Sequence, residues 1–383
     1  MKKYLICMGN PNDINCWSGI PYHFLKEANY QSFELEGLNL NPKNLSIFRY
    51  LWNLKKFLLT GSYSGFQYSA FFLNNLFKQS NIRKEEKLII ISMHPLLPNI
   101  INNNWRIFYY IDATTKQIFE EYNNFPLISE KYKNKILIKE KNNYKNSKLI
   151  FCMSEWTKNS LIKHYSVPDK KIIIVPGGAN IPRNFLKENN YKYIIPPIPS
   201  KQNPLRIGFL GQDWFRKGGP IALEVVNQLN LKSIPSVLRV MGISNSVLPK
   251  NKHLQNIGFL DKNKNMDKFI AELKSWHFGS LFSRAEAFGI SNRECLLLGV
   301  PVICNDVGGI RSTLPPDNYG CIFRVNQNPK FIADWIENQI KDYSNYTKLR
   351  DNVSNNNYSL TWEPAISNIF SHLSFYEKDN NLN

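Results

Sequence analysis

The sequence has few cysteines and no pattern that would join them to one another or to a metal. Its 383 residues include six cysteines, without a Cys-x-x-Cys pair or a His-rich segment. This scatter predicts reduced thiols and argues against structural zinc. An Asp-x-Asp motif between apolar strands, which would indicate a divalent-cation site, is also lacking. The cysteines are Cys7, Cys16, Cys152, Cys295, Cys304 and Cys321.

Long hydrophobic runs are absent as well. No stretch reaches the roughly 18 apolar residues that a membrane span requires. The start, MKKYLICMGN, has only about six apolar residues before a polar turn, which is short for the core of a signal peptide. We therefore expect a cytoplasmic protein, with peripheral attachment to the inner face of the cell membrane left open.

Acidic residues are in the minority. The chain has 48 Lys and Arg against 30 Asp and Glu, a formal net charge of +18. An anionic partner would suit this balance, whether nucleotide phosphates, a polyphosphate lipid, an acidic membrane face or nucleic acid. A Lys-rich, solvated surface without a specific polyanion explains it equally well, so charge alone does not choose between these partners.

Apolar residues are plentiful enough for a folded core. Hydrophobic residues make up 43% of the chain and aromatic residues 13%, too many for a disordered protein. One hydrophobic core seldom organises a chain of this length. We therefore expect two α/β domains of similar size, and a single large domain is the alternative.

Short apolar runs recur ahead of helical patterns, as in parallel α/β sheets. A Pro-rich stretch, YKYIIPPIPSKQNP (191–204), interrupts the series and suits a connector between domains. We place the first domain at 1–195 and the second at 205–360, and expect a last helix over 362–376 to return to the first domain. The runs lie at 4–8, 87–92, 106–111, 148–153, 171–176, 206–210, 236–242, 278–283 and 301–306.

Ligands of such sheets bind beyond the carboxyl ends of the strands, and one strand exit there is basic. The segment GQDWFRKGGPIALEVV (211–226) leads into a helix predicted to start at Pro220. Arg216 and Lys217 would lie at the positive end of that helix, which is unfavourable without a nearby anion. The loop suits a diphosphate, and a solvated basic turn is the alternative.

A second strand exit carries two carboxylates, in SRAEAFGISNRECLLLGVPVICNDVGG (283–309). Glu286 stands in the loop, and Glu294 falls in the first turn of a helix that Ser291 is predicted to cap. Carboxylates accept paired hydrogen bonds from the vicinal hydroxyls of a sugar or ribose. The alternative is structural, because Ser291 to Glu294 spells the S-x-x-E capping box.

The second loop and the residues that follow it resemble the E-x7-E signature and the next helix and strand of the retaining family-4 (group 1) glycosyltransferases. The basic loop around Lys217 resembles the diphosphate loop of that family. Two further segments resemble family elements, SEWTKNSLIKHYSVPDKKIIIVPGGAN (154–180) and WSGIPYHFL (17–25). The resemblance implies the GT-B fold, in which two Rossmann-like doubly wound parallel-sheet domains face a cleft that holds the donor.

Carried over by position, the resemblance gives each residue a role. Glu294 would bind ribose hydroxyls and Glu286 the hydroxyls of the donor sugar, while Lys217 and Arg216 hold the diphosphate. Gln212 stands where many members have arginine, so Arg216 would supply the second cation. Ala287 stands where glycine is common, which leaves the donor sugar open. Backbone N–H groups of Phe288, Gly289 and Ile290 would face the phosphates, and Gly19 would let the first-domain loop approach them.

Two residues of the first domain are further candidates for the site. His94, at the exit of the 87–92 run, resembles the cleft histidine of the family near the donor sugar, and an ordinary surface or hydrogen-bonded histidine is the alternative. Asp112, in YYIDATTKQ, could meet the acceptor hydroxyl. The more common role for an aspartate there is an N-cap or Asx turn before the next helix.

The function implied is transfer of a hexosyl group from a nucleoside diphosphate sugar to a glycan or lipid-linked acceptor hydroxyl with retention, without a metal or other cofactor. Bacterial polysaccharide or glycolipid assembly would use such a reaction. A sugar-nucleotide epimerase and a non-catalytic GT-B-like binding or assembly protein are the alternatives. Nucleic acid is not expected as a partner, because no basic helix or aromatic-basic motif of the recognised kinds is present.

Two segments suggest a membrane-facing acceptor. FRYLWNLKKFLL (48–59) mixes aromatic, Leu and basic residues at near-helical spacing, and residues 131–148 are strongly basic. An interfacial helix beside a basic patch could dock on anionic lipids. The alternative is a core-packed amphipathic helix and a solvated basic face.

Overall fold

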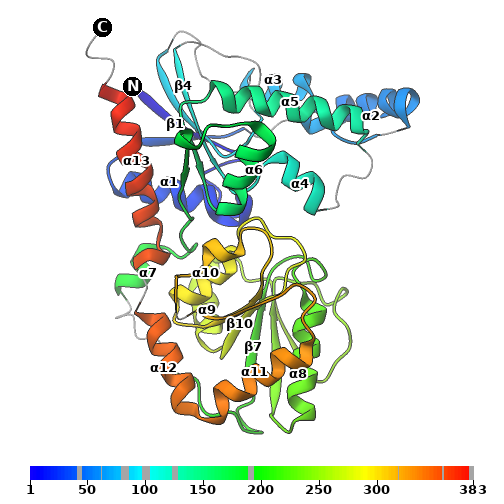
Figure 1. Ribbon diagram of the computed structural model, residues 1–383, viewed down its shortest axis with the longest axis vertical. Coiled ribbons are helices and arrows are strands. Elements are labelled where there is room, and N and C mark those ends of the chain that lie inside the picture. Colours follow the sequence, from blue (N-terminus) through cyan, green and yellow to red (C-terminus); the bar gives the residue numbers. More distant parts are fainter. Residues whose placement is uncertain are drawn as a thin grey trace. The chain divides into compact units, whose positions relative to one another are not determined.

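The chain forms two compact units, each built on its own sheet (Figure 1). The computed structural model describes residues 1–40, 45–61, 63–78, 86–96, 104–122, 128–188, 194–317, 319–355 and 358–378. Unit 1 comprises Met1–Pro176 and Ala365–Asn383, and unit 2 comprises Gly177–Pro364. Each sheet has six parallel strands with helices packed against it, which confirms the predicted α/β class with two Rossmann-like halves.

The sheet of unit 1 has the strand order β2-β1-β3-β4-β5-β6. Its central strand β3 is buried along its whole length, as expected for a parallel strand covered on both faces. Because β1 pairs with both β2 and β3, the order reverses between β1 and β3. The strands are β1 (Lys2–Ile6), β2 (Leu35–Leu38), β3 (Leu88–Ser92), β4 (Trp105–Ile111), β5 (Ile150–Cys152) and β6 (Ile172–Ile174).

The helices of unit 1 surround this sheet, and the C-terminal helix α13 (Trp362–Lys378) packs on it. The ring of Phe370 stacks on Phe33 with centroids 4.0 Å apart, and Tyr376 contacts Phe108 at 5.4 Å. The other α-helices are α1 (Ile20–Tyr30), α2 (Ser46–Thr60), α3 (Ala70–Lys78), α4 (Thr115–Glu121), α5 (Glu130–Asn146) and α6 (Glu155–Tyr165), with short 3-10 helices η1 (Cys16–Gly19), η2 (Phe66–Tyr68) and η3 (Asp169–Lys171).

The sheet of unit 2 has the order β12-β11-β10-β7-β8-β9, and its order reverses between β7 and β10. The strands are β7 (Leu205–Leu210), β8 (Ser236–Met241), β9 (Leu254–Gly258), β10 (Phe278–Leu281), β11 (Val302–Asn305) and β12 (Gly320–Phe323). The helices are α7 (Arg183–Glu188), α8 (Gly219–Leu231), α9 (Lys262–Lys274), α10 (Ile290–Leu297), α11 (Pro329–Lys341) and α12 (Tyr343–Ser354), with η4 (Ile310–Thr313) and η5 (Tyr358–Leu360).

The connector between the units belongs to unit 2, so the division differs from the boundary placed at 195–205. The guanidinium of Arg350 donates to the carbonyl of Ile194 at 2.7 Å, and the hydroxyl of Tyr343 donates to that of Pro196 at 2.5 Å. The indole N–H of Trp362 donates to the side-chain oxygen of Asn180 at 3.0 Å. These hydrogen bonds join residues after position 176 to α12 and the start of α13.

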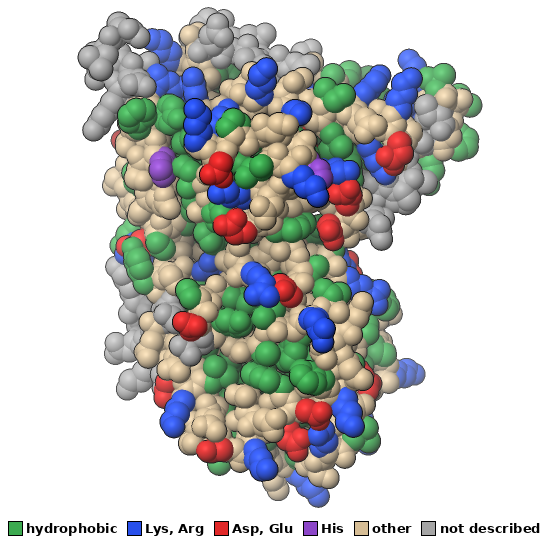
Figure 2. All heavy atoms as spheres, in the orientation of Figure 1, with side chains coloured by type: hydrophobic (Ala, Val, Ile, Leu, Met, Phe, Trp, Pro, Cys, Tyr) green, Lys and Arg blue, Asp and Glu red, His purple; other side chains and the backbone are tan. Residues whose placement is uncertain are grey.

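Charged side chains are dispersed on the visible surface. Figure 2 shows Lys and Arg spread over the visible face of each unit, with Asp and Glu between them. On this face the high net charge is therefore a distributed property of the surface, which gives no support to a nucleic-acid groove.

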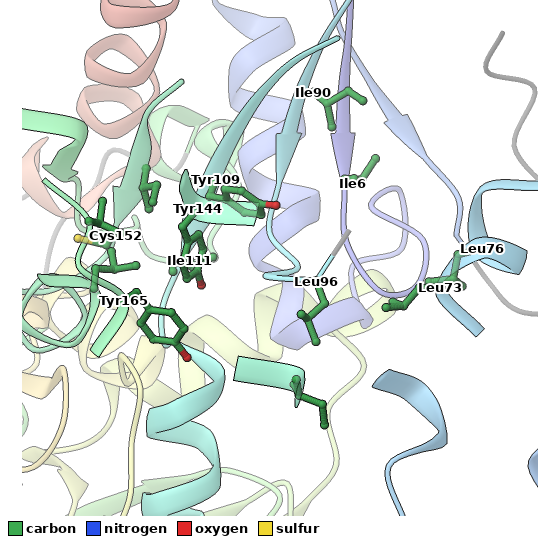
Figure 3. Close-up of a cluster of buried hydrophobic side chains, with 14 of the residues drawn as sticks. Ile6, Leu73, Leu76, Ile90, Leu96, Tyr109, Ile111, Tyr144, Cys152 and Tyr165 are labelled. Carbon is green, nitrogen blue, oxygen red and sulfur yellow. The ribbon is translucent and has the colours of Figure 1, made fainter. Parts of the chain in front are cut away.

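The core of unit 1 combines aliphatic and tyrosine side chains. Figure 3 shows part of it, with Tyr109, Tyr144 and Tyr165 close together beside Cys152. The rings of Tyr144 and Tyr109 meet edge to face with centroids 5.2 Å apart, as do those of Tyr144 and Tyr165. The hydroxyls of Tyr144 and Tyr165 donate to the buried carboxylate of Glu140, which also accepts the N–H of Thr115 at 2.9 Å. This network fixes the start of α4.

Candidate functional site

In unit 2 the two predicted donor loops lie at the point where the strand order reverses. The loop with Arg216 and Lys217 follows β7, and the loop with Glu286 follows β10. These two strands are neighbours in the sheet, paired through Gly208 and Gly279. Adjacent loops at such a switch point form the usual ligand crevice of an open α/β sheet.

A glycine allows the basic loop to lie in direct contact with the Glu286 loop. Gly218 has φ +75°, and a Cβ there would lie 2.0 Å from the carbonyl oxygen of Phe282. The N–H of Arg284 donates to the carbonyl of Arg216 at 2.8 Å, which joins the two loops directly. Gly218 caps α8, which begins at Gly219, one residue before the predicted Pro220. Only glycine satisfies both the left-handed backbone and the close approach.

Glu286 lies between the two predicted diphosphate-binding cations. Its Oε2 is 3.2 Å from Nζ of Lys217 and 3.3 Å from Nη1 of Arg216, and it accepts the Ser283 hydroxyl at 3.2 Å. Burial alone would raise the pKa of Glu286, but the charges of Lys217 and Arg216 outweigh it, so its pKa is lowered. The carboxylate is ionised, and both cations are held at the switch point.

The loop that follows β11 contacts the backbone of the Glu286 loop. The N–H of Gly309 donates to the carbonyl of Glu286 at 3.1 Å. Gly308 has φ +57°, and a Cβ there would lie 1.9 Å from the same carbonyl oxygen. The Gly-Gly pair after β11 therefore fixes the backbone position of Glu286.

Helix α10 begins differently from the prediction. Its N-cap is Gly289 in the left-handed conformation, so Ser291 lies inside the helix and caps nothing. The capping-box alternative is wrong here, because Gly289 can adopt φ +86° and turn the chain before Ser291 is reached. Ser291 Oγ is buried without a hydrogen-bond partner within the described structure. Phe288, Gly289 and Ile290 lie at the positive end of α10, where an anion is stabilised.

Glu294 has a partner that no local sequence pattern indicates. Its carboxylate, 1% exposed, is paired with Lys262 at the start of α9, and the ammonium of Lys262 lies 4.4 Å from the ring centroid of Phe269. Burial raises the pKa of Glu294, and the charges of Lys262 and Lys217 offset this only in part. Lys262 directly follows Asp261, the N-cap of α9, and lies outside both motifs. A long-range ion pair leaves no local pattern in a sequence.

In unit 1, the predicted residues Gly19 and His94 also follow the two strands between which the order reverses. The loop after β1 ends in three consecutive left-handed residues, Trp17, Ser18 and Gly19, with φ of +48°, +57° and +88°. Gly19 caps α1 without a side-chain hydrogen bond. The Sγ atoms of Cys7 and Cys16, at the two ends of this loop, are 3.7 Å apart.

His94 is held by the backbone of its own turn. Its Nδ1 lies 2.9 Å from the carbonyl oxygen and 3.2 Å from the amide nitrogen of Leu96. Burial lowers the pKa of His94 to about 4, so the imidazole is neutral near pH 7. Any contact of the ring with a ligand would come from Nε2.

Asp112 does not cap α4. The cap is Thr114, whose hydroxyl accepts the N–H of Gln117 while the side chain of Gln117 accepts the N–H of Thr114. The cap alternative for Asp112 is therefore wrong, because a complete capping box two residues later already satisfies the helix start. The carbonyl of Asp112 accepts a hydrogen bond from the hydroxyl of Thr157 on α6.

The structure thus forms two groups of predicted residues, one in each unit. Arg216, Lys217, Glu286 and Glu294 are close together in unit 2, and Gly19 and His94 share the switch point of unit 1. In the described ranges, no three His, Cys, Asp or Glu side chains gather as a metal-ion site would require.

Comparison with known proteins supports the predicted resemblance to the group 1 glycosyltransferases. The family model described as glycosyl transferases group 1 matches residues 192–360, which lie in unit 2. None of the curated protein sequences matches this chain. Three similar solved structures share 12–15% sequence identity with it.

These three structures cover nearly the whole chain. Sucrose-phosphate synthase from Thermosynechococcus elongatus has a TM-score of 0.67 at 15% identity, covering 99% of this chain and 100% of the other. HepE from Anabaena, solved with UDP, has a TM-score of 0.64 at 12% identity, covering 98% and 100%. WaaG, a glycosyltransferase involved in lipopolysaccharide biosynthesis, has a TM-score of 0.56 at 13% identity, covering 95% and 98%.

The family match falls on the unit that holds the basic loop, Glu286 and Glu294. The structural matches extend over both units, and both sheets have the parallel Rossmann-like architecture. Residues 192–360, most of unit 2, thus match the group 1 glycosyltransferases, and the two parallel sheets have the GT-B fold of the similar structures.

Proposed function

We propose that this enzyme transfers a hexosyl group from a nucleoside diphosphate sugar to an acceptor hydroxyl with retention of configuration and without a metal. The observation that carries the proposal is the convergence of Lys217 and Arg216 on Glu286 at the switch point of unit 2. Two cations and a hydroxyl-binding carboxylate at one crevice suit a sugar joined to a diphosphate.

The proposed chemistry depends on stabilising the leaving group. Departure of the nucleoside diphosphate leaves an oxocarbenium-like sugar, and negative charge develops on the phosphate oxygens. Lys217, Arg216 and the N-terminus of α10 would stabilise that charge, the role that preorganised donors fill in many enzymes. Glu294 would hold the ribose, and Glu286 would exchange its cations for hydroxyls of the sugar when the donor binds.

Residues of unit 1 would complete the reaction. Gly19 lets its loop approach the phosphates, and neutral His94 would donate or accept a hydrogen bond near the sugar without adding charge. Asp112 would meet the acceptor hydroxyl. No carboxylate is assigned as a nucleophile, so retention would follow a same-face route in which the leaving phosphate takes the proton of the acceptor.

Donor and acceptor classes are supported by what similar structures contain. HepE was solved with UDP-glucose, and TarM with UDP and α-GlcNAc-glycerol. WaaG is involved in lipopolysaccharide biosynthesis. We propose a nucleoside diphosphate sugar as donor, a glycan or lipid-linked acceptor, and a role in bacterial polysaccharide or glycolipid assembly.

We also propose that the enzyme works in the cytoplasm, attached peripherally to the inner face of the cell membrane. Over the described part of the chain, no helix is long and apolar enough to cross a bilayer. A lipid-linked acceptor would make such attachment useful.

A thermal-shift screen tests the donor site. The purified protein is heated with UDP, GDP, ADP and their sugar conjugates without metal, alongside Glu294→Ala and Lys217→Ala. A ligand at about 100 times its Kd adds roughly 2.7 kcal/mol to the stability of the folded state. We expect one nucleotide to stabilise the wild type, and both substitutions to abolish the shift.

Two product assays separate transfer from the alternatives. Retention predicts a glycoside with the anomeric configuration of the donor, read by NMR. An epimerised sugar nucleotide without transfer would identify an epimerase instead. A folded protein that responds to no nucleotide would favour a non-catalytic binding or assembly role.

A further inference from the structure

Helix α2 (Ser46–Thr60) presents its apolar residues to solvent. A helix on a globular protein normally buries its apolar stripe and exposes polar residues. Here Leu51, Leu54 and Leu58 are 54%, 45% and 75% exposed, whereas Trp52, Asn53 and Lys56 are the half-buried positions. The core-packed alternative for this segment is therefore wrong.

The exposed residues form one continuous face. Positions 47, 51, 54 and 58 are separated by three or four residues, and Tyr50 and Phe57 flank them, so all lie on one side of the helix. Ile47 is 71% exposed, Tyr50 68% and Phe57 54%. We call these six residues the α2 stripe. Surface hydrophobic residues are usually scattered, and a contiguous patch marks an interaction site.

The opposite side of α2 anchors the helix to unit 1. The ring of Trp52 contacts Phe66 with centroids 6.0 Å apart and Tyr132 of α5 at 5.6 Å. Nζ of Lys56 lies 4.3 Å from the ring centroid of Tyr132. Figure 1 shows α2 at the outer edge of unit 1. The stripe is thus held outward by contacts on the reverse face.

The basic residues around the α2 stripe indicate an anionic partner. The sequence has no Asp or Glu between Glu36 and Glu85, and α2 contains Arg49, Lys55 and Lys56. Burial lowers the pKa of Lys56, as do the positive charges of Lys135 on α5 and of Lys55, so α5 adds to the same positive region. In Figure 2 hydrophobic and basic side chains lie side by side at this end of unit 1, with acidic side chains among them.

We infer that the α2 stripe inserts into the interface of an anionic phospholipid bilayer, with the neighbouring Lys and Arg contacting lipid phosphates. An apolar helix face rimmed by cations, without a membrane-spanning length, is the arrangement of interfacial helices. This surface belongs to unit 1, whereas the proposed donor loops belong to unit 2. The membrane attachment proposed above would use the α2 stripe, whether or not the chain transfers a sugar.

Vesicle co-sedimentation tests this inference with the full chain. The wild type is mixed with vesicles of phosphatidylglycerol and phosphatidylcholine, or of phosphatidylcholine alone. The test variant is Leu51→Ser/Leu54→Ser/Leu58→Ser. The matched control, Leu231→Ser/Phe331→Ser, removes residues of unit 2 that are 78% and 57% exposed. A third variant, Lys55→Gln/Lys135→Gln, removes charge only.

We expect the wild type and the control to bind anionic vesicles equally. The triple variant should bind at least tenfold more weakly, and each removed Lys should cost about fivefold, since a basic residue near an anionic surface contributes about 1 kcal/mol. Raised salt should weaken wild-type binding. Circular dichroism and the thermal shift with nucleotide should be unchanged in the triple variant, because its residues are exposed and belong to unit 1, whereas the proposed donor loops belong to unit 2.

Three results would overturn the inference. The wild type could fail to bind anionic vesicles at low salt, or the triple variant could bind as the wild type does. Size-exclusion chromatography could instead show a dimer that the triple variant breaks, which would make the stripe a contact between copies of the chain. A lost nucleotide response with retained vesicle binding would count against the donor site alone.

Discussion

The ammonium of Lys217 lies 3.2 Å from the carboxylate of Glu286, although the two residues come from different loops and were assigned to different parts of the donor. Both side chains are largely buried, 14% and 11% exposed. The carboxylate thus neutralises Lys217 and Arg216, the two cations that we propose bind the diphosphate. In the proposed donor site, a bound diphosphate would replace this ion pair, so that Glu286 and phosphate would compete for Lys217.

This competition predicts a split effect of Glu286→Gln. Transfer should fall by about 100-fold or more, as when one transition-state contact is lost. Affinity for the nucleoside diphosphate alone should stay constant or increase, because Lys217 and Arg216 lose an anionic competitor. Calorimetric titrations with the diphosphate and with its sugar conjugate measure both. Glu337→Gln, which changes a surface ion pair with Lys232, is the control. Equal loss of affinity for both ligands would contradict the competition.

Two glycine substitutions in the basic loop should have opposite profiles. A Cβ at Gly211 would lie 2.3 Å from Cδ of Lys217, which a flexible side chain can avoid. Gly211→Ala should leave the melting temperature nearly unchanged but weaken diphosphate binding about tenfold, because Lys217 is displaced. Gly218→Ala should lower the melting temperature by several degrees, since the left-handed backbone alone costs roughly 1–2 kcal/mol and its Cβ meets a carbonyl oxygen. Melting curves and titrations distinguish the two, and similar destabilisation of both would count against this account.

The central strands were predictable and three edge strands were not. Strands such as β3 are buried throughout and appear as apolar runs, whereas β2, β9 and β12 lie at or toward sheet edges and are only partly buried. Partly buried strands alternate with polar residues and resemble loops in sequence. Their identity depends on neighbours distant in the chain, which no local pattern reports.

The parts of the candidate site that depend on local sequence features were predictable. The parts that depend on contacts between residues distant in the sequence were not. The basic loop and the two glutamates were found because a strand exit and a helix start are local features. Lys262 was missed because its ion pair with Glu294 crosses 32 positions. The cap at Ser291 was wrong because two starts were compatible with the sequence, and Gly289 takes the earlier one.

The two glutamates should shift stability with pH in opposite directions. The pKa of Glu294 is raised above its ordinary value of about 4.5 in the folded state. Its stabilising contribution is therefore fully present below pH 4.5 and is lost as the pH rises through the raised pKa. Glu294→Gln should therefore raise the melting temperature of the ligand-free enzyme at pH 7, with the gain fading toward pH 4, while nucleotide binding weakens.

Glu286 provides the comparison in the same melting experiments. Its pKa is lowered, so it stabilises the fold above about pH 4.5 and loses this effect as the pH falls further. Glu286→Gln should therefore destabilise the ligand-free enzyme at pH 7, with the loss disappearing in acid. If both substitutions changed stability in the same direction at pH 7, the opposite environments described for the two carboxylates would be wrong.

Cys16 should be the most reactive of the six thiols. The hydrogen bond from Cys7 lowers the pKa of Cys16, whereas that hydrogen bond and burial raise the pKa of Cys7. Thiolates are the form that alkylating reagents attack. With iodoacetamide at pH 7, mass spectrometry should find Cys16 modified first. Cys321 is the control because it is similarly half-buried but burial raises its pKa. Cys7→Ala removes the hydrogen bond and should slow alkylation of Cys16 several-fold; unchanged alkylation would show that exposure alone governs its reactivity.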